Sequence, residues 1–525
     1  MKKPTVGDVI VIGILFVFSW WLMNKSFGYD MGTSQFRIAR HEVGDFGLHI
    51  SLIRSFSWGD NTPAQSPFFP GKPLVYHYAV DWIAGQLVRW GIRIDYALNS
   101  VSAVAMTVLL YMLYRLAKLL FGDSSIVGFI AIILFLLPGN LSFIDIFKQA
   151  PKDSSFLHYL WRFPDYIHKG PFDGSMITIY TTLAPYLNQR HLIAGMAIGV
   201  SVLYLVVGWL KGHKRIPDST YALLGIAIGL ATRVHLAVAA ATGIMVFLLL
   251  IGKKKRTIFS FVGMMFLGAL PHLIQVFSIR SVANVTVWNP GYLSPRPLAL
   301  FSFFLFWLYN LGALIILVPL AWRRAGPMER RLLVGVGLLF LLANCFQFSN
   351  RIEHNHSLIN YATLLMLPFV ANLLSAWWQR KKIWWKLASA GSLFFLTVSG
   401  AFNLMVVKND YQFMVDDAPK NTFMQWVKTH TAPRSIFLTQ PELYDPVTLA
   451  GRKNYLGHEY YVSVMGYDYG SRKNQIASWL TALDEGQIFS MRAAGIDYLV
   501  LPKEKEVGNL MVGVFENRQV AVYKL

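Results

Sequence analysis

The sequence predicts an all-α polytopic membrane domain followed by a small α/β domain outside the membrane. Hydrophobic residues make up 54% of the 525 positions and charged residues only 14%, whereas soluble globular proteins carry about 25% charged residues. A helix that crosses the hydrocarbon core needs about 20 apolar residues, and the chain holds about eleven runs of this kind. This composition excludes an ordinary soluble enzyme and a disordered protein.

The chain is strongly basic, with 48 Lys+Arg against 28 Asp+Glu and a net charge of +20. Nucleic-acid binding is one interpretation of such an excess. The basic residues gather between apolar runs, however, as the positive-inside rule of membrane topology requires. We therefore expect membrane lipids and phosphate-bearing substrates, and no nucleic acid, as partners. The single cysteine, Cys345, excludes an intrachain disulfide and a zinc site built from several cysteines.

The first apolar run covers residues 6–23 and follows two lysines. No small-residue cleavage site follows it, so we expect a retained span with its N-terminus in the cytoplasm. Arg233 and His235 interrupt the run over 219–251, and all basic clusters fall on the cytoplasmic side if this run is a pair of short helices. The later predicted spans are 97–121, 124–147, 192–210, 219–233, 235–251, 257–278, 299–321, 332–348, 358–378 and 384–407.

These spans predict the domain organisation. Residues 1–407 form a membrane domain with a structured first outer loop, 24–94, and a second outer loop, 148–190. Residues 408–525 form an extracytoplasmic α/β domain, and the expected location is the inner (cytoplasmic) membrane. Within that domain, FMQWVKTH and IASWLTAL have the periodicity of helices, whereas SIFLTQ, IDYLVLP and QVAVYKL are typical of strands.

The first outer loop contains the most informative segment, HEVGDFGLHISLIRSFSWGDN, residues 41–61. On a helix, Glu42, Asp45 and His49 would share one face. These three residues are the predicted catalytic group, because a low dielectric raises the pKa of a carboxylate and suits it to act as a general base. The alternative is a solvated loop helix with a local Asp–His contact.

Two further segments carry candidate substrate-binding residues. Residues 67–85 are rich in proline, which shapes a turn, and Tyr76, His77 and Asp81 then open a helix near the membrane surface. An interfacial aromatic belt would explain the same pattern. The second segment lies at the outer mouth of a span, where an arginine could clamp a phosphate or extend to the surface as an end residue. Its residues are Asn188, Gln189, Arg190 and His191.

Ionisable residues between apolar helices are costly, so Arg233 and His235 are expected to face a cavity or a partner. In the outer loop 349–360, Arg351 and His354 are further candidates. His354 and His356 lie two positions apart, which puts them on different faces of a helix and gives little support to a metal site.

The segment 449–472 is dense in Gly, Tyr and charge. Aromatic rings with fixed polar groups suit hydroxyl-rich ligands, so this segment could present a sugar-binding surface. Turn chemistry with packed aromatics is the alternative. The candidate residues are Arg452, His458, Tyr467 and Asp468.

Neither a phosphate-binding glycine loop in a strand–turn–helix context nor a GxSxG elbow occurs in the sequence. A long outer loop after the first span, with acidic residues near its start, resembles the GT-C superfamily of integral-membrane glycosyltransferases. HEVGDFGLH, YHY-x-x-D, the NQRH mouth, LAGRKNYLGHEYY and GYDYGSR look like segments of its uncharacterised bacterial members.

The resemblance implies a GT-C-like fold and a reaction on the outer face of the membrane. A sugar would move from a polyprenyl-phosphate-linked donor to a lipid, glycan or protein acceptor. Asp45 matches the family's acidic position best and Glu42 second, with His49 in support, whereas Arg190 or Arg233 would meet the lipid phosphate. The E-x-x-D spacing departs from the common D-x-D or E-x-D. It leaves open which carboxylate is the base and whether a divalent cation, Mg or Mn, takes part.

Two other functions are compatible with a polytopic chain. A transporter or lipid flippase is the first, although such proteins often show matched halves with broken helices and no such symmetry is evident here. An inactive scaffold protein is the second.

Overall fold

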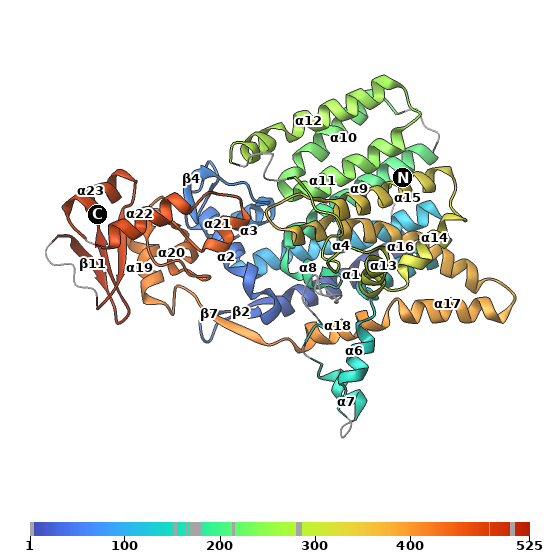
Figure 1. Ribbon diagram of the computed structural model, residues 1–525, viewed down its shortest axis with the longest axis horizontal. Coiled ribbons are helices and arrows are strands. Elements are labelled where there is room, and N and C mark those ends of the chain that lie inside the picture. The colour runs from blue at the N-terminus through green and yellow to red at the C-terminus, as the bar shows by residue number, and fades with distance from the viewer. Residues whose placement is uncertain are drawn as a thin grey trace. The chain divides into compact units, whose positions relative to one another are not determined.

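Apolar runs of the sequence form helices through most of the first 411 residues (Figure 1). The computed structural model describes residues 5–151, 155–163, 165–167, 180–212, 216–279, 286–481, 483–504 and 510–525. The chain divides into two compact units. The first contains Met1–Lys25, Ser102–Pro271 and Ala283–Tyr411, and the second contains Ser26–Val101, His272–Val282 and Gln412–Leu525.

The first unit is helical. Three of its helices, α1, α4 and α12, also reach into residues of the second unit. Its elements are α1 (Val6–Ser26), α4 (Ile94–Leu120), α5 (Ser125–Leu136), α6 (Ser142–Gln149), α7 (Phe156–Trp161), α8 (Ala184–Asn188), α9 (Arg190–Lys211), α10 (Asp218–Leu230), α11 (Thr232–Leu250), α12 (Lys255–Phe277), α13 (Leu300–Leu311), α14 (Leu314–Trp322), α15 (Pro327–Cys345), α16 (His356–Trp378), α17 (Ile383–Phe395), α18 (Val398–Asn409), the 3-10 turn η4 (Ile352–Asn355), and the short strands β5 (Val287–Trp288) and β6 (Phe346–Gln347).

Among the described residues, seven helices are long and apolar enough to cross a membrane, or up to eight if the bent pair α13 and α14 is one span. The polytopic helical character is therefore confirmed. The count of about eleven is not confirmed, since α5 and α10 have only 12 and 13 residues, about 18–20 Å of helix. The predicted pair of helices over 219–251 is confirmed as α10 and α11.

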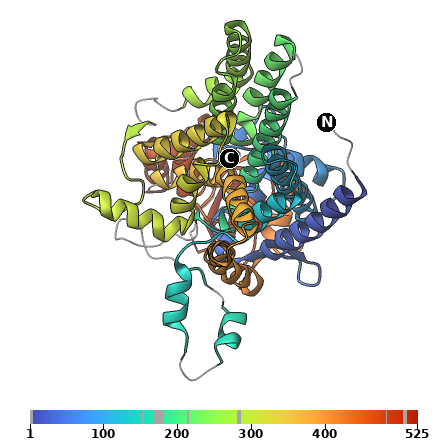
Figure 2. The ribbon, with the colours of Figure 1, turned by 90° about the vertical axis from the view of Figure 1, so that its right-hand side faces the viewer.

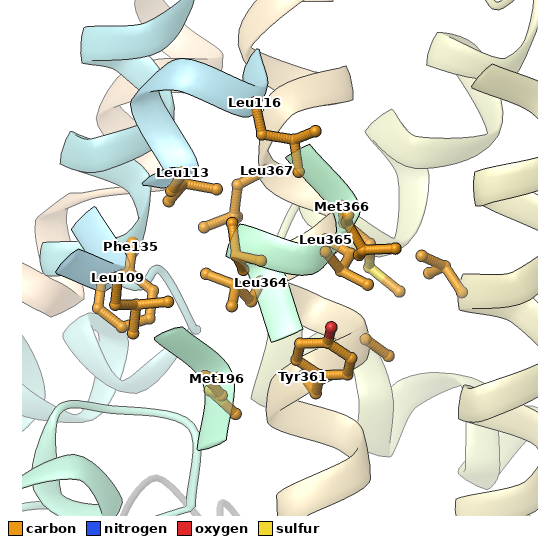
Figure 3. Close-up of a cluster of buried hydrophobic side chains, with 14 of the residues drawn as sticks. Leu109, Leu113, Leu116, Phe135, Met196, Tyr361, Leu364, Leu365, Met366 and Leu367 are labelled. Carbon is orange, nitrogen blue, oxygen red and sulfur yellow. The ribbon is translucent and has the colours of Figure 1, made fainter. Parts of the chain in front are cut away.

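The core of the first unit lies around α16. Four consecutive residues of this helix, Leu364 to Leu367, are all buried, although consecutive residues of a helix point in different directions. They pack in one cluster with Leu109 and Leu113 of α4, Phe135 of α5 and Met196 of α9 (Figure 3). A helix that is apolar on all sides belongs at the centre of a bundle, and α16 occupies that position.

At an edge of the same unit, α10 and α12 pack closely side by side (Figures 1 and 2). Gly225 and Gly229 form a GxxxG pattern on α10, and a Cβ at either position would overlap the backbone of α12. Gly268 of α12 faces α10 in the same way. Small residues at this spacing are typical of helix pairs inside membranes, where close backbone approach provides the packing energy.

The second unit combines short helices with sheets. Its elements are β1 (Phe27–Asp30), β2 (Gln35–Ala39), the 3-10 turn η1 (Arg40–Glu42), α2 (Val43–Ser57), β3 (Gln65–Ser66), β4 (Phe69–Pro73), α3 (Ala79–Arg89), β7 (Gln412–Asp416), α19 (Thr422–His430), β8 (Ile436–Leu438), α20 (Pro446–Leu449), β9 (Lys453–Asn454), α21 (Glu459–Val464), α22 (Gly470–Thr481), α23 (Glu485–Ala493), β10 (Tyr498–Pro502), β11 (Val512–Glu516) and β12 (Val520–Lys524).

Two sheets organise this unit. A five-stranded sheet has the order β11-β12-β10-β8-β9, with β10 parallel to β8 and antiparallel to β12. A three-stranded antiparallel sheet, β1-β2-β7, joins the first loop to the C-terminal segment, and Phe36 pairs with Val415 in its register. The helices and strands predicted after residue 408 are confirmed as α19, α22, β8, β10 and β12. The boundary between 407 and 408 and the sidedness of the termini stay predictions.

The predicted first outer loop is folded throughout much of its length into β1–β4, α2 and α3. Of the predicted second outer loop, 148–190, the structure describes α7 and α8. Residues 152–154, 164 and 168–179 of that loop lie outside the described part of the chain.

A buried ion pair connects α2 to the residues that follow β7. The Arg54 guanidinium donates to both carboxylate oxygens of Asp417 at 3.2 and 3.0 Å, and both side chains are almost completely buried. Arg54 also lies over the ring of Trp58. Burial lowers the pKa of Arg54 to about 10, and Asp417 partly offsets that effect.

We expect Asp417→Asn to destabilise the folded chain, because it leaves the buried guanidinium without a counter-charge. Breaking a buried pair in this way costs about 3–5 kcal/mol, and the unfolding temperature of the full chain in detergent should fall. Asp60→Asn is the matched control, since Asp60 pairs with Arg434 on the surface at 2.7 Å and exposed pairs contribute about 0–1 kcal/mol. Equal shifts in the two variants would contradict the assigned role of the Arg54–Asp417 pair.

Candidate functional site

The predicted catalytic residues lie at the start of α2, within the second unit. Asp45 occupies the first turn of α2 and His49 the second, so these two share one face as the sequence predicts. Glu42 does not belong to this helix, which corrects the prediction for it. Glu42 ends the 3-10 turn η1 and precedes α2 as its N-cap residue. Its side chain is buried, and its catalytic role stays a prediction.

His49 and Asp81 form a buried pair between α2 and α3. The Nδ1 atom of His49 lies 2.9 Å from Oδ1 of Asp81, and both side chains are almost fully inaccessible. Asp81 belongs to the first turn of α3, which approaches α2 closely because Gly85 faces Phe56 and the carbonyl of Ile53 without a side chain between them. Burial raises the pKa of Asp81, and His49 opposes that shift.

This geometry changes the role expected for Asp81. One of its oxygens is engaged by His49, and the other, Oδ2, is buried with no hydrogen-bond partner in the described part of the chain. A carboxylate that holds one ring nitrogen of an imidazole fixes the orientation of that ring. Asp81 is therefore better described as a positioning residue for His49 than as a first contact for substrate.

Asp45 is half-buried on the same face of α2. Burial raises the pKa of its carboxyl, and the neighbouring His49 lowers it. Three tyrosines are affected by its negative charge. Burial is the main cause of the raised pKa of Tyr76, Tyr444 and Tyr461, and the charge of Asp45 is the second cause. A carboxylate in this setting is disposed to take up a proton, because its surroundings disfavour the charged form.

Two of these tyrosines also hold the beginning of α2. Tyr444 donates its hydroxyl to the carbonyl of Val43 at 2.7 Å, and Tyr461 donates to the carbonyl of Gly44 at 2.8 Å. Tyr461 belongs to the LGHEYY segment, so the sequence offered a signal for it. Tyr444 lies in a turn 401 positions after Val43, and no local pattern in the sequence singles it out.

Tyr76 and His77 lie just before α3 and are half-buried. The ring of Tyr76 is 6.5 Å from that of His49 and 5.6 Å from that of His77, centroid to centroid. Tyr76 thus lies beside His49 and His77, and the substrate-binding roles of Tyr76 and His77 stay predictions.

Some of the C-terminal residues predicted to bind sugar are buried in structural contacts, and others are accessible. Arg452 is buried and donates to Thr431 Oγ1 and to the carbonyls of Trp58, Ala450, Lys428 and Thr431. These five bonds use every N–H of a guanidinium, so none remains for a sugar and the prediction for Arg452 is wrong.

Two other predicted sugar-binding residues of that segment, Tyr467 and Asp468, make packing and turn contacts. Tyr467 is buried, donates its hydroxyl to the carbonyl of Pro73 and stacks on Phe69 at 5.1 Å. Asp468 is exposed and accepts from the backbone of Gly470. His458 is half-buried at the N-cap of α21, and the sugar-binding roles of His458 and Asp468 stay predictions.

The first unit contains the arginines that the sequence analysis predicts to bind the lipid phosphate. Arg190, at the start of α9, is fully buried, and its guanidinium contacts the sulfur and the carbonyl of Met23. The alternative of an arginine extending to the surface is therefore wrong. His191 stacks on His235 at 5.3 Å, and α11 is kinked at His235. Arg233 is half-buried beside this kink.

The other candidates of this unit form polar contacts near the start of α16. Gln189 Nε2 lies 3.1 Å from Nε2 of His356, a buried residue that the sequence analysis did not select. Asn188 is half-buried. Arg351 is exposed and pairs with Glu353 at 3.2 Å, whereas His354 bonds to Ser349 at 2.7 Å.

The chain was compared with known proteins. No family model and no curated protein matches it. A similar solved structure is the oligosaccharyltransferase of Archaeoglobus fulgidus in its apo form, with a TM-score of 0.46 and 13% sequence identity over 94% of this chain and 69% of that chain. The function proposed below rests on this chain's own residues.

We expect Gly47→Ala to disturb the position of α2. A Cβ at Gly47 would overlap the carbonyl oxygen of Leu443 and lie 2.8 Å from the hydroxyl of Tyr461, and overpacking of this kind costs about 1–3 kcal/mol. A lower unfolding temperature of the full chain would report the loss. Gly44→Ala is the control on the same helix, since a Cβ there meets nothing within 4 Å. If Gly44→Ala proved as destabilising as Gly47→Ala, close packing at Gly47 would not be the cause.

Proposed function

We propose that the protein is a membrane glycosyltransferase that moves a sugar from a polyprenyl-phosphate-linked donor to a lipid, glycan or protein acceptor. The observation that carries the proposal is the half-buried carboxylate of Asp45 in the first turn of α2, one helical turn before the buried His49 and on the turn whose carbonyls Tyr444 and Tyr461 bind. Burial raises the pKa of this carboxyl. The GT-C-like segments of the sequence support the same function. A donor anchored in lipid also requires helices that reach the bilayer, which the first unit provides.

In the proposed reaction Asp45 acts as the general base. An acceptor hydroxyl attacks the anomeric carbon of the donor sugar, and its proton passes to the Asp45 carboxylate. The bond between that carbon and the phosphate oxygen breaks, and the polyprenyl phosphate or diphosphate leaves with the electron pair. General-base catalysis of this kind contributes about 10²–10⁴-fold to a rate. His49, held by Asp81, supplies a ring close to the carboxylate that favours its ionised form before the proton arrives.

Arg190 and Arg233 are the residues proposed to receive the phosphate, since a guanidinium binds phosphate oxygens in a bidentate manner. A divalent cation, Mg or Mn, stays part of the proposal because these ions prefer oxygen ligands. Among the described residues, the carboxylates of Asp45, Glu42 and Asp81 are not grouped closely enough to hold such an ion together, so no step of the proposed reaction depends on it.

Asp45→Asn should abolish transfer while the fold stays intact, because the amide keeps the shape of the side chain but cannot accept the proton. The measurement is the release of undecaprenyl phosphate from undecaprenyl-phosphate-linked hexoses and pentoses by the full chain in membranes, with a membrane-lipid extract as acceptor. We expect a loss of about 10²–10⁴-fold. Asp60→Asn, on the surface of the same unit, should retain activity. Full activity of Asp45→Asn would remove the assignment of Asp45 as the base.

His49→Gln should move the acidic limb of the pH–rate profile to higher pH. His49 lowers the pKa of Asp45, so its removal raises that pKa further and the base becomes ionised only at higher pH. Rates at pH 5–9 in the same assay would show the shift, with partial recovery of activity at the alkaline end. An unshifted limb with a uniformly lower rate would mean that His49 acts on packing alone.

A further inference from the structure

The turn between α16 and α17 carries an unusual concentration of tryptophan and positive charge. The segment WWQRKKIWWK covers residues 377–386 and contains four tryptophans and four basic residues. Tryptophan is enriched where a helix meets the membrane–water interface. The exposed side chains of Trp378 and Trp384 therefore mark this turn as lying at headgroup level.

Positive charge at the turn has no acidic counterpart in its own segment. Lys381 and Lys382 are exposed, and the sequence contains no Asp or Glu between Glu353 and Asp410. Arg380 is engaged differently, because its guanidinium lies 4.1 Å from the ring centre of Trp385. A cluster of uncompensated lysines beside a membrane attracts anionic lipid headgroups.

An apolar groove opens directly beside this turn. It has a volume of about 570 Å³ and is formed by three helices of the first unit, α5, α16 and α17. The side chains that give it its apolar character are Ile126 and Ile130 of α5, Leu374 and Trp378 of α16, and Leu393 and Phe394 of α17. Trp378 and Gln379 bring the groove to the basic turn itself. Pockets of about 300–1,000 Å³ are the size that holds small organic ligands.

The length of the groove fits an acyl chain within one leaflet. Along α17 its lining runs from Ser389 to Phe394, which corresponds to about 8 Å at 1.5 Å per residue, and Thr397 extends it past the end of that helix. Half of the hydrocarbon core measures about 15 Å. Close packing of α16 on α17, fixed by the bond from Ser389 to the carbonyl of Leu374 at 2.9 Å, keeps the floor of the groove in place.

We propose that this groove binds an anionic diacyl phospholipid, with the acyl chain along α17 and the headgroup phosphate at Lys381, Lys382 and Lys386. The combination of an apolar channel with a cationic rim at headgroup level matches the two ends of such a lipid. A zwitterionic lipid offers the same chains without the net charge, and it should bind more weakly. The site is independent of the transfer reaction proposed above.

The test uses the full chain in detergent, titrated with dioleoyl-phosphatidylglycerol or dioleoyl-phosphatidylcholine and followed by native mass spectrometry. The chain should retain one phosphatidylglycerol molecule at least tenfold more tightly than phosphatidylcholine. The triple variant K381Q/K382Q/K386Q should lose that preference. The matched control K253Q/K254Q/K255Q removes three lysines from another exposed basic turn and should keep it.

A second variant tests the groove rather than the charge. Ala390 is exposed and lines the groove, so Ala390→Phe should fill the space and weaken phosphatidylglycerol at least tenfold without lowering the unfolding temperature. The proposal is overturned if the control triple weakens binding as much as the turn triple, or if Ala390→Phe leaves binding unchanged. A dimer that Ala390→Phe dissociates would equally overturn it, because a second copy would then be the occupant.

Discussion

The position of α2 is set along its whole length by residues that lie 363 to 417 positions later in the chain. Tyr444 and Tyr461 bond to the carbonyls of its first turn, Ser51 bonds to Thr448 at 2.9 Å, and Arg54 pairs with Asp417. Beyond its end, Arg452 donates to the carbonyl of Trp58. Each contact replaces water on a buried polar group, and such groups are costly when unpaired. Moving α2 would therefore break several of them together.

This anchoring explains how a charged group can be kept in an unfavourable place. A carboxylate loses hydration when it is buried, and a mobile helix would turn Asp45 toward water. The tyrosine bonds at the start of α2 and the His49–Asp81 pair against α3 oppose that rotation. Groups that are fixed before a substrate arrives need no reorganisation during a reaction. The C-terminal segment thus affects the candidate site by holding α2 in position. Its own arginine, Arg452, uses all its N–H groups in structural hydrogen bonds.

Local patterns in the sequence were sufficient for the helices, for the C-terminal strands and for the shared face of Asp45 and His49, because periodicity depends on neighbours within a few residues. They failed for Glu42, where a 3-10 turn ends just before the helix. They also failed for the Arg54–Asp417 pair, whose partners are 363 positions apart, and for Tyr444. The count of about eleven spans is not confirmed, because hydropathy marks an apolar run without fixing the length of the helix in it, and α5 and α10 have only 12 and 13 residues. Arg452 lies in a segment whose composition is typical of a binding surface, and only its bonds to backbone carbonyls show that it is a structural residue.

Asp45 and the lysines between α16 and α17 differ in how much hydration their charged groups lose. Asp45 is half-buried, and burial raises the pKa of its carboxyl, so the group becomes able to take up a proton. Lys381 and Lys382 stand exposed between tryptophans at a helical turn, so their charge keeps its hydration and remains available to an anion. Desolvation thus suits the first group to chemistry, and solvation suits the second to binding. The tryptophans fix the depth of the turn, while the tyrosines, with one hydroxyl each, fix the orientation of the helix that carries the carboxylate. The sequence predicts Asp45 as the base, but the packing that buries its helix comes from residues far along the chain, such as Tyr444 and Tyr461, which local patterns do not reveal.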